Sequence, residues 1–99
     1  MLVVNQQLQQ LGKLKFGKPH HFTYTLTNTS DKPVTITRLA VGCTSCTKAS
    51  VSPSYLAPNQ QATVSVTFTP GSIGNQSKAL DVVYDGGVLK LQFKAESYE

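Results

Sequence analysis

The sequence predicts an all-β protein, an immunoglobulin-like β-sandwich of about seven antiparallel strands. Apolar and polar residues alternate with a period of two in several short segments, as they do in half-buried antiparallel strands. Turn residues separate these segments at intervals of about eight to twelve residues, which is typical of sandwiches, and no segment shows a helical period. The chain has 99 residues, enough for one domain around one hydrophobic core.

The N-terminal residues divide into two parts. Residues 1–11 carry Leu2, Val3, Val4 and Leu8 among glutamines, and we expect them to form an N-terminal arm or edge strand that binds a partner. The rest of the chain, from residue 12 to residue 99, is expected to form the single immunoglobulin-like domain.

The clearest strand is residues 22–27, in which three apolar side chains alternate with three threonines. Turn-forming residues fill positions 28–33 and predict a loop. Alternation resumes over residues 34–41, but the apolar positions move from even to odd numbers. Such a shift predicts a β-bulge near Arg38 or Leu39.

The C-terminal half contains three further predicted strands. Residues 49–55 are expected to be short and irregular, and residues 62–69 alternate as a strand. The last two strands flank a glycine-containing turn, for which a two-residue turn at Gly86-Gly87 would pair Tyr84 with Leu89. That register makes every pair on the inner face apolar.

The uneven distribution of charge bears on whether the protein binds nucleic acid. The net charge is +4, with six bases and one acid in residues 1–50 and three bases and four acids in residues 51–99. Lys13, Lys15 and Lys18 lack interleaved aromatic residues, so a solvated strand edge is favoured over a nucleic-acid site. No motif indicates a small-molecule ligand.

Two sequence features bear on the location of the protein. No segment approaches the about 20 apolar residues of a membrane span. The N-terminal residues lack the basic leader and apolar segment of a signal peptide. We therefore expect the protein to act in the cytoplasm or in a virion.

Cys43 and Cys46 have the C-x-x-C spacing of thiol oxidoreductases and of half a zinc site. An oxidoreductase site places its first cysteine at a helix N-terminus, whereas this region is predicted to be strand and loop. Three interpretations remain open: a local disulfide or paired thiols in a loop, two buried inert thiols, and a metal site.

A metal site would need a histidine in addition to the cysteines. Folding residues 22–26 back on residues 34–41 as a hairpin brings His20 and His21 near Cys43. Adjacent strand residues point to opposite faces, so at most one histidine joins the thiols. The favoured interpretation is a solvated strand start at His20 and His21, with no metal and no other cofactor.

No catalytic acid and base can be paired along the chain. Asp81, Asp85, Glu96 and Glu99 fall on outward strand positions, in turns or in the tail. No histidine base is assigned to the serines. We therefore expect the protein not to be an enzyme.

The order of several short motifs resembles a known family. These motifs are Lys15-Phe16-Gly17, residues 22–30, Gly42-Cys43 with Cys46-Thr47, Leu56-Ala57-Pro58, and residues 66–70 with Gly74. Over residues 12–96 they resemble the Hydin-like (ASH) immunoglobulin-like domains and their bacterial relatives of unknown function with a cysteine-corner motif. The corner in those relatives commonly reads C-G-C-T, and here Thr44-Ser45 makes it one residue longer. The resemblance implies a docking sandwich, related in architecture to major sperm protein and pilus-chaperone domains, without catalysis.

Two hypotheses for the role follow. The first is a non-enzymatic structural module that binds protein subunits of a large assembly, most concretely a capsid decoration or tail-associated protein of a bacteriophage virion. The second is a cell-envelope or cytosolic binding domain in which Cys43 and Cys46 respond to redox state or metal. The first predicts binding through the strand edges and the N-terminal arm.

Overall fold

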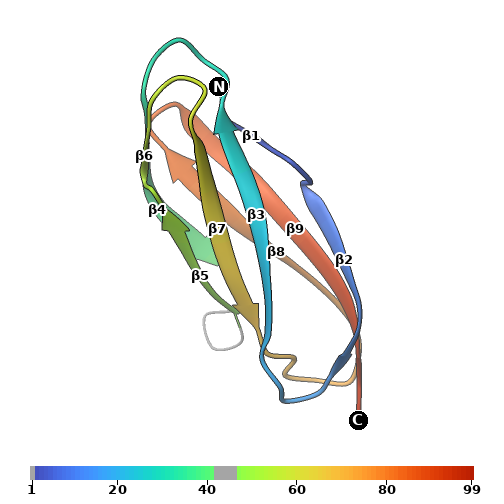
Figure 1. Cartoon of the computed structure of the whole chain (residues 1–99). Coiled ribbons are helices and arrows are strands. Elements are labelled where there is room, and N and C mark those ends of the chain that lie inside the picture. Colours follow the sequence, from blue (N-terminus) through green and yellow to red (C-terminus); the bar gives the residue numbers. More distant parts are fainter. Residues whose placement is uncertain (1, 42–46) are drawn as a thin grey trace.

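The computed structural model of the chain describes residues 2–41 and 47–99. Over these residues the chain forms nine strands in two facing sheets and no helix (Figure 1). The strands are β1 (Leu2–Val4), β2 (Leu8–Lys15), β3 (His20–Asn28), β4 (Val34–Val41), β5 (Thr47–Ser52), β6 (Tyr55–Leu56), β7 (Gln61–Phe68), β8 (Gly74–Tyr84) and β9 (Gly87–Tyr98). This confirms the predicted β-sandwich.

The two sheets differ in size and in the directions of their strands. One sheet has four strands in the order β1-β3-β7-β5, and the other has five in the order β2-β9-β8-β4-β6. All pairs are antiparallel except β2 with β9, which are parallel. The parallel pair departs from the prediction of antiparallel strands alone.

The parallel pair arises because the chain changes sheets near its start. β1 pairs with β3 in the four-stranded sheet, and β2 then continues beside β9 in the five-stranded sheet. A second change of sheet occurs at Pro53, between β5 and β6. On each side of the sandwich, one stretch of chain therefore contributes an edge strand to both sheets.

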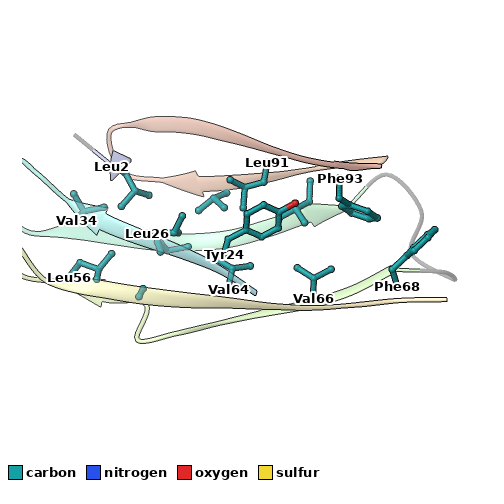
Figure 2. Close-up of a cluster of buried hydrophobic side chains, with 14 of the residues drawn as sticks. Leu2, Tyr24, Leu26, Val34, Leu56, Val64, Val66, Phe68, Leu91 and Phe93 are labelled. Atoms are coloured by element: carbon teal, nitrogen blue, oxygen red, sulfur yellow. The ribbon is translucent and has the colours of Figure 1, made fainter. Parts of the chain in front are cut away.

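The hydrophobic core lies between the sheets (Figure 2). Phe93 of β9 packs edge-on against Phe22 and Phe68 of the opposite sheet, with ring centroids 4.9 and 5.1 Å away. The Tyr24 hydroxyl crosses the same gap and donates a hydrogen bond of 2.6 Å to the Gln92 carbonyl. Aromatic contacts and a hydrogen bond thus join the two layers.

One predicted pairing, the hairpin of residues 22–26 with residues 34–41, is wrong. β3 pairs with β1 and β7, whereas β4 pairs with β6 and β8 in the other sheet. The Asn28 side chain holds the connecting loop in place by hydrogen bonds to Ser30 and to the Lys32 carbonyl. The loop therefore bridges the two sheets instead of closing a hairpin.

The last hairpin forms, but in a different register from the predicted one. Tyr84 pairs with Gly87 and Val82 with Leu89, so the two-residue turn is Asp85-Gly86. A shift of two residues leaves the inner face apolar, because strand side chains alternate with a period of two.

Two further predictions concern a bulge in β4 and the regularity of β5. The predicted bulge in β4 is present, as an irregularity in the pairing with β8 between Ile36 and Arg38. The stretch expected to be irregular, residues 49–55, instead contains most of β5, which pairs with β7 without interruption from Thr47 to Ser52.

Candidate functional site

Cys43 and Cys46 lie outside the described residues, so the structure does not test the predictions made for them. They fall in the connection between Val41, the last residue of β4, and Thr47, the first residue of β5. Among residues 2–41 and 47–99, no group of three or more His, Cys, Asp or Glu side chains is placed to hold a metal ion.

The two histidines lie on opposite faces of β3, as their adjacency requires. His21 is exposed, and its Nδ1 lies 2.8 Å from the Thr67 hydroxyl. His20 is half-buried, pairs across the sheet with Phe68, and has a buried Nε2 without a hydrogen-bond partner in the described part of the chain. His20 is thus less solvated than the sequence predicted.

The four apolar residues of the predicted partner-binding arm occupy edge strands of the sandwich itself. Leu2 is buried in the core with 3% of its surface exposed, while Val3 is 37% exposed. Val4 and Leu8 are half-buried. Binding of a partner by these residues stays a prediction, and among them Val3 presents the most accessible side chain.

Among residues 2–41 and 47–99, no strand pairs with the outer side of β5, which is therefore an open sheet edge. β5 is the last strand of the four-stranded sheet, and its six residues pair with β7 in one continuous register. The other edges are less suited to receive a strand: β1 and β6 are very short, and β2 carries a bulge at Gly12. Short strands and bulges are common protections of sheet edges.

The hydrogen-bonding direction of β5 follows from its neighbours. The Asn28 N–H donates to the Gln60 carbonyl, which places the even-numbered residues of β3 and β7 in the hydrogen-bonded pairs between these two strands. The odd-numbered residues of β7 then face β5. By the same alternation, the main-chain N–H and C=O groups of Ala49 and Val51 point to the open edge.

The surroundings of this edge are mostly apolar on the inner side. The side chains of Ala49 and Val51 are half-buried against the core, as are those of Leu39 and Val41 on β4. β4 and β5 lie next to each other on the same side of the sandwich (Figure 1). A strand added to β5 can therefore place alternate side chains against apolar surface.

Sequence reasoning missed this edge because it treated the residues after the cysteines as irregular. The available signal was the alternation of half-buried Ala49 and Val51 with exposed Lys48, Ser50 and Ser52. The serine-rich composition obscured the pattern, since serine is not enriched in strands.

Comparison with known families gives a match over nearly the whole chain. Residues 2–97 match the family described as "Protein of unknown function (DUF1573)". The chain belongs to this family. Comparison with curated proteins finds no match.

Several solved structures share the fold of this DUF1573 chain. A protein of unknown function from Porphyromonas gingivalis W83 has a TM-score of 0.83 at 11% identity, and the match covers 96% of this chain and 46% of that chain. The ASH/PapD-like domain 7 of human CEP192 has a TM-score of 0.72 at 17% identity, covering 99% and 85%. In fold, the likeness to an ASH domain agrees with the predicted resemblance, whereas the cysteine-corner motif lies outside the described residues.

A third similar structure comes from an enzyme. The VesB protease of Vibrio cholerae has a TM-score of 0.75 at 17% identity, with 99% of this chain but 32% of that chain covered. This chain spans less than half of both the P. gingivalis and the V. cholerae proteins. At these identities the likeness shows the fold alone.

The structure also bears on membrane insertion. Within the described residues, no helix has the length and apolar character to cross a membrane.

Proposed function

We propose that this DUF1573 domain is a non-enzymatic protein-interaction module that binds an extended peptide segment of a partner by strand addition at β5. The observation that carries this proposal is the open edge of β5, with the N–H and C=O groups of Ala49 and Val51 directed away from β7. In strand addition, main-chain hydrogen bonds supply affinity and alternate side-chain contacts supply specificity.

The arrangement of the described residues favours a binding role over a catalytic one. The carboxylates of Asp31 and Asp85 lie at one end of the molecule, in loops, and no histidine is hydrogen-bonded to a serine or to an acid in the described chain. The sequence resemblance to ASH domains, which implies a docking sandwich, agrees with a binding role.

The proposal is tested by selecting peptides from a displayed random library on the wild-type domain and mapping their contacts by hydrogen exchange. We expect the bound peptide to slow exchange of the Ala49 and Val51 amides. Ala49→Pro removes an edge-facing N–H and should weaken binding about tenfold or more while β7 pairing persists. Ala49→Lys offers a second route, because an inward lysine blocks strand addition.

The matched control is Thr23→Pro, which removes an N–H that also faces away from β7 but on the opposite side of the sheet. Selected peptides that bind Ala49→Pro and Ala49→Lys as tightly as the wild type would contradict the proposal. So would exchange protection centred on another strand. Circular dichroism and thermal melts establish that each variant is folded.

The finer predictions from the sequence need tests of their own. Nothing in the comparisons supports a place in a bacteriophage virion as a decoration or tail-associated protein, so the proposal does not extend to that setting. A role for Cys43 and Cys46 in sensing redox state or metal is likewise not included. Replacing both with serine should leave peptide binding at β5 unchanged, whereas a sensing role requires a change.

A further inference from the structure

The end of the sandwich near the C-terminus carries exposed apolar side chains from three separate segments. Phe16, Ile73 and Tyr98 are 44, 55 and 47% exposed. The Phe16 N–H donates to the Tyr98 carbonyl at 2.8 Å. Gly74 pairs with Ser97 in antiparallel strands, so Ile73, the residue before Gly74, lies close to Tyr98, the residue after Ser97. The main chains of these three exposed residues thus lie close together at this end of the sandwich, whereas apolar residues are more often exposed singly on a surface.

A groove lined mainly by polar and charged residues adjoins this apolar cluster on the outer face of the five-stranded sheet. Its volume is about 600 Å³, and it runs across β2, β9 and β8. The register aligns two rows of its lining residues, Gln10-Lys94-Ser77 and Lys13-Glu96-Asn75. The bulge places Gly12, with a φ of 76° that favours glycine, in the lining of the groove.

Positive charge prevails around the groove and the apolar cluster. Lys13 and Lys94 line the groove, Lys15 pairs with Tyr98, and Lys18 follows in the turn. Against these four lysines stand Glu96 and Glu99, which leaves an excess of two positive charges. We call this combination of groove, apolar cluster and lysines the basal surface.

We propose that the basal surface binds an acidic, extended segment of a protein partner that carries an apolar residue. The lysines pair with its carboxylates, the amide side chains of Gln10 and Asn75 hydrogen-bond its main chain, and its apolar residue packs on Phe16, Ile73 and Tyr98. This surface is separate from the β5 edge, which belongs to the other sheet.

Other anionic partners fit the surface less well. A nucleic-acid strand carries no aliphatic side chain to pack on the exposed Ile73, and Ile73 offers no aromatic face for stacking of bases. A lipid bilayer would contact the apolar cluster but leave the groove empty. A peptide fills the groove and meets both the charges and the apolar cluster.

The test is fluorescence anisotropy with a labelled peptide of sequence Glu-Glu-Ile-Glu-Glu-Leu-Glu-Glu on the full chain. We expect saturable binding that weakens with added salt. Lys13→Gln with Lys94→Gln should raise Kd about tenfold or more. Ile73→Ser with Tyr98→Ser should raise it by a similar factor, while the charge-matched control Lys32→Gln with Lys90→Gln should change it by less than about twofold.

Three outcomes would overturn the proposal. They are no saturable binding of the acidic peptide by folded wild-type protein, equal weakening in the control pair, and tighter binding of oligothymidylate or phosphatidylserine vesicles than of the peptide. Ala49→Pro should bind the acidic peptide normally. Failure of the β5 proposal and failure of this one can therefore be told apart.

Discussion

At the scale of single residues, Asn28 is the polar centre of the fold. It is fully buried, and its side-chain amide donates to the carbonyls of Lys32 and Leu56 at 2.8 and 3.1 Å. Its side-chain oxygen accepts hydrogen bonds from the Ser30 N–H and hydroxyl. One amide thus satisfies groups from a loop and from β6, which belong to different parts of the chain.

We expect Asn28→Ala to lower the free energy of unfolding by about 2–4 kcal/mol, since it leaves buried groups such as the Leu56 carbonyl without their donor. Urea denaturation measures the change. Asn75→Ala, at an exposed asparagine on β8, serves as the control and should change stability by less than about 0.5 kcal/mol. Equal effects of the two substitutions would contradict the role given to Asn28.

Tyr24 links stability to alkaline pH. Burial raises the pKa of its hydroxyl from 10.0 to about 12. The folded state therefore holds this proton more tightly than the unfolded chain does. The resulting stabilisation is complete below pH 10 and is lost as the pH rises toward 12.

We expect the free energy of unfolding to fall by about 2 kcal/mol between pH 10 and pH 12 through this group. Tyr24→Phe should lack that part of the pH dependence, whereas Tyr98→Phe, at an exposed tyrosine, should retain it. Urea titrations at a series of pH values compare the three proteins. Parallel curves of unfolding free energy against pH for all three proteins would rule out Tyr24 as the source of this pH dependence.

Asn59 shows how the conformation of one residue shapes a turn. It has a φ of 66°, and the Gln60 N–H donates to the Ala57 carbonyl, which makes Pro58 and Asn59 the centre of a tight turn. Asparagine tolerates a positive φ better than most residues other than glycine, so it suits this position of the turn.

At the scale of elements, β1 is part of the core despite its three residues. Its Leu2 side chain reaches the buried cluster, as Figure 2 shows, whereas Val3 points to solvent. We expect Leu2→Ala to lower the free energy of unfolding by about 2–4 kcal/mol. Val3→Ala is the control and should cost less than about 0.5 kcal/mol. A purely partner-binding arm would leave stability unchanged in both variants when measured by urea denaturation.

The sequence pattern determines some properties of the strands and leaves others open. Alternation predicted which side chains of β3 and β7 are buried, because Tyr24, Leu26 and Val64 fall on the inward positions. It could not tell which sheet each strand joins, since both sheets bury one face in the same way. The wrong hairpin of β3 with β4 follows directly from this ambiguity.

The register of the last hairpin illustrates a second limit. Gly86-Gly87 and Asp85-Gly86 are both good two-residue turns, and the two registers differ by two residues. Both keep the same side chains on the inner face, so hydrophobic pattern alone cannot choose between them. Gly87 then takes a φ of 149°, which favours glycine at the start of β9.

At the scale of the whole molecule, the two changes of sheet decide which edges remain open. One stretch of chain supplies β1 and β2, and the other supplies β5 and β6, so each side of the sandwich has an edge strand in both sheets. The fold class could be predicted because it depends on strand number and alternation. The candidate surfaces could not, because β5 and the basal surface depend on which strands become neighbours.

The parallel pairing of β2 with β9 also bears on how the domain responds to tension. In Figure 1 the two ends of the chain lie at opposite ends of the sandwich. A force that pulls them apart acts along β2 and β9, so it loads the hydrogen bonds of this pair in shear and together instead of opening them one after another. Where the domain is linked at both ends to other parts of an assembly, this geometry should make it slow to unfold under load, and single-molecule pulling would measure that rate.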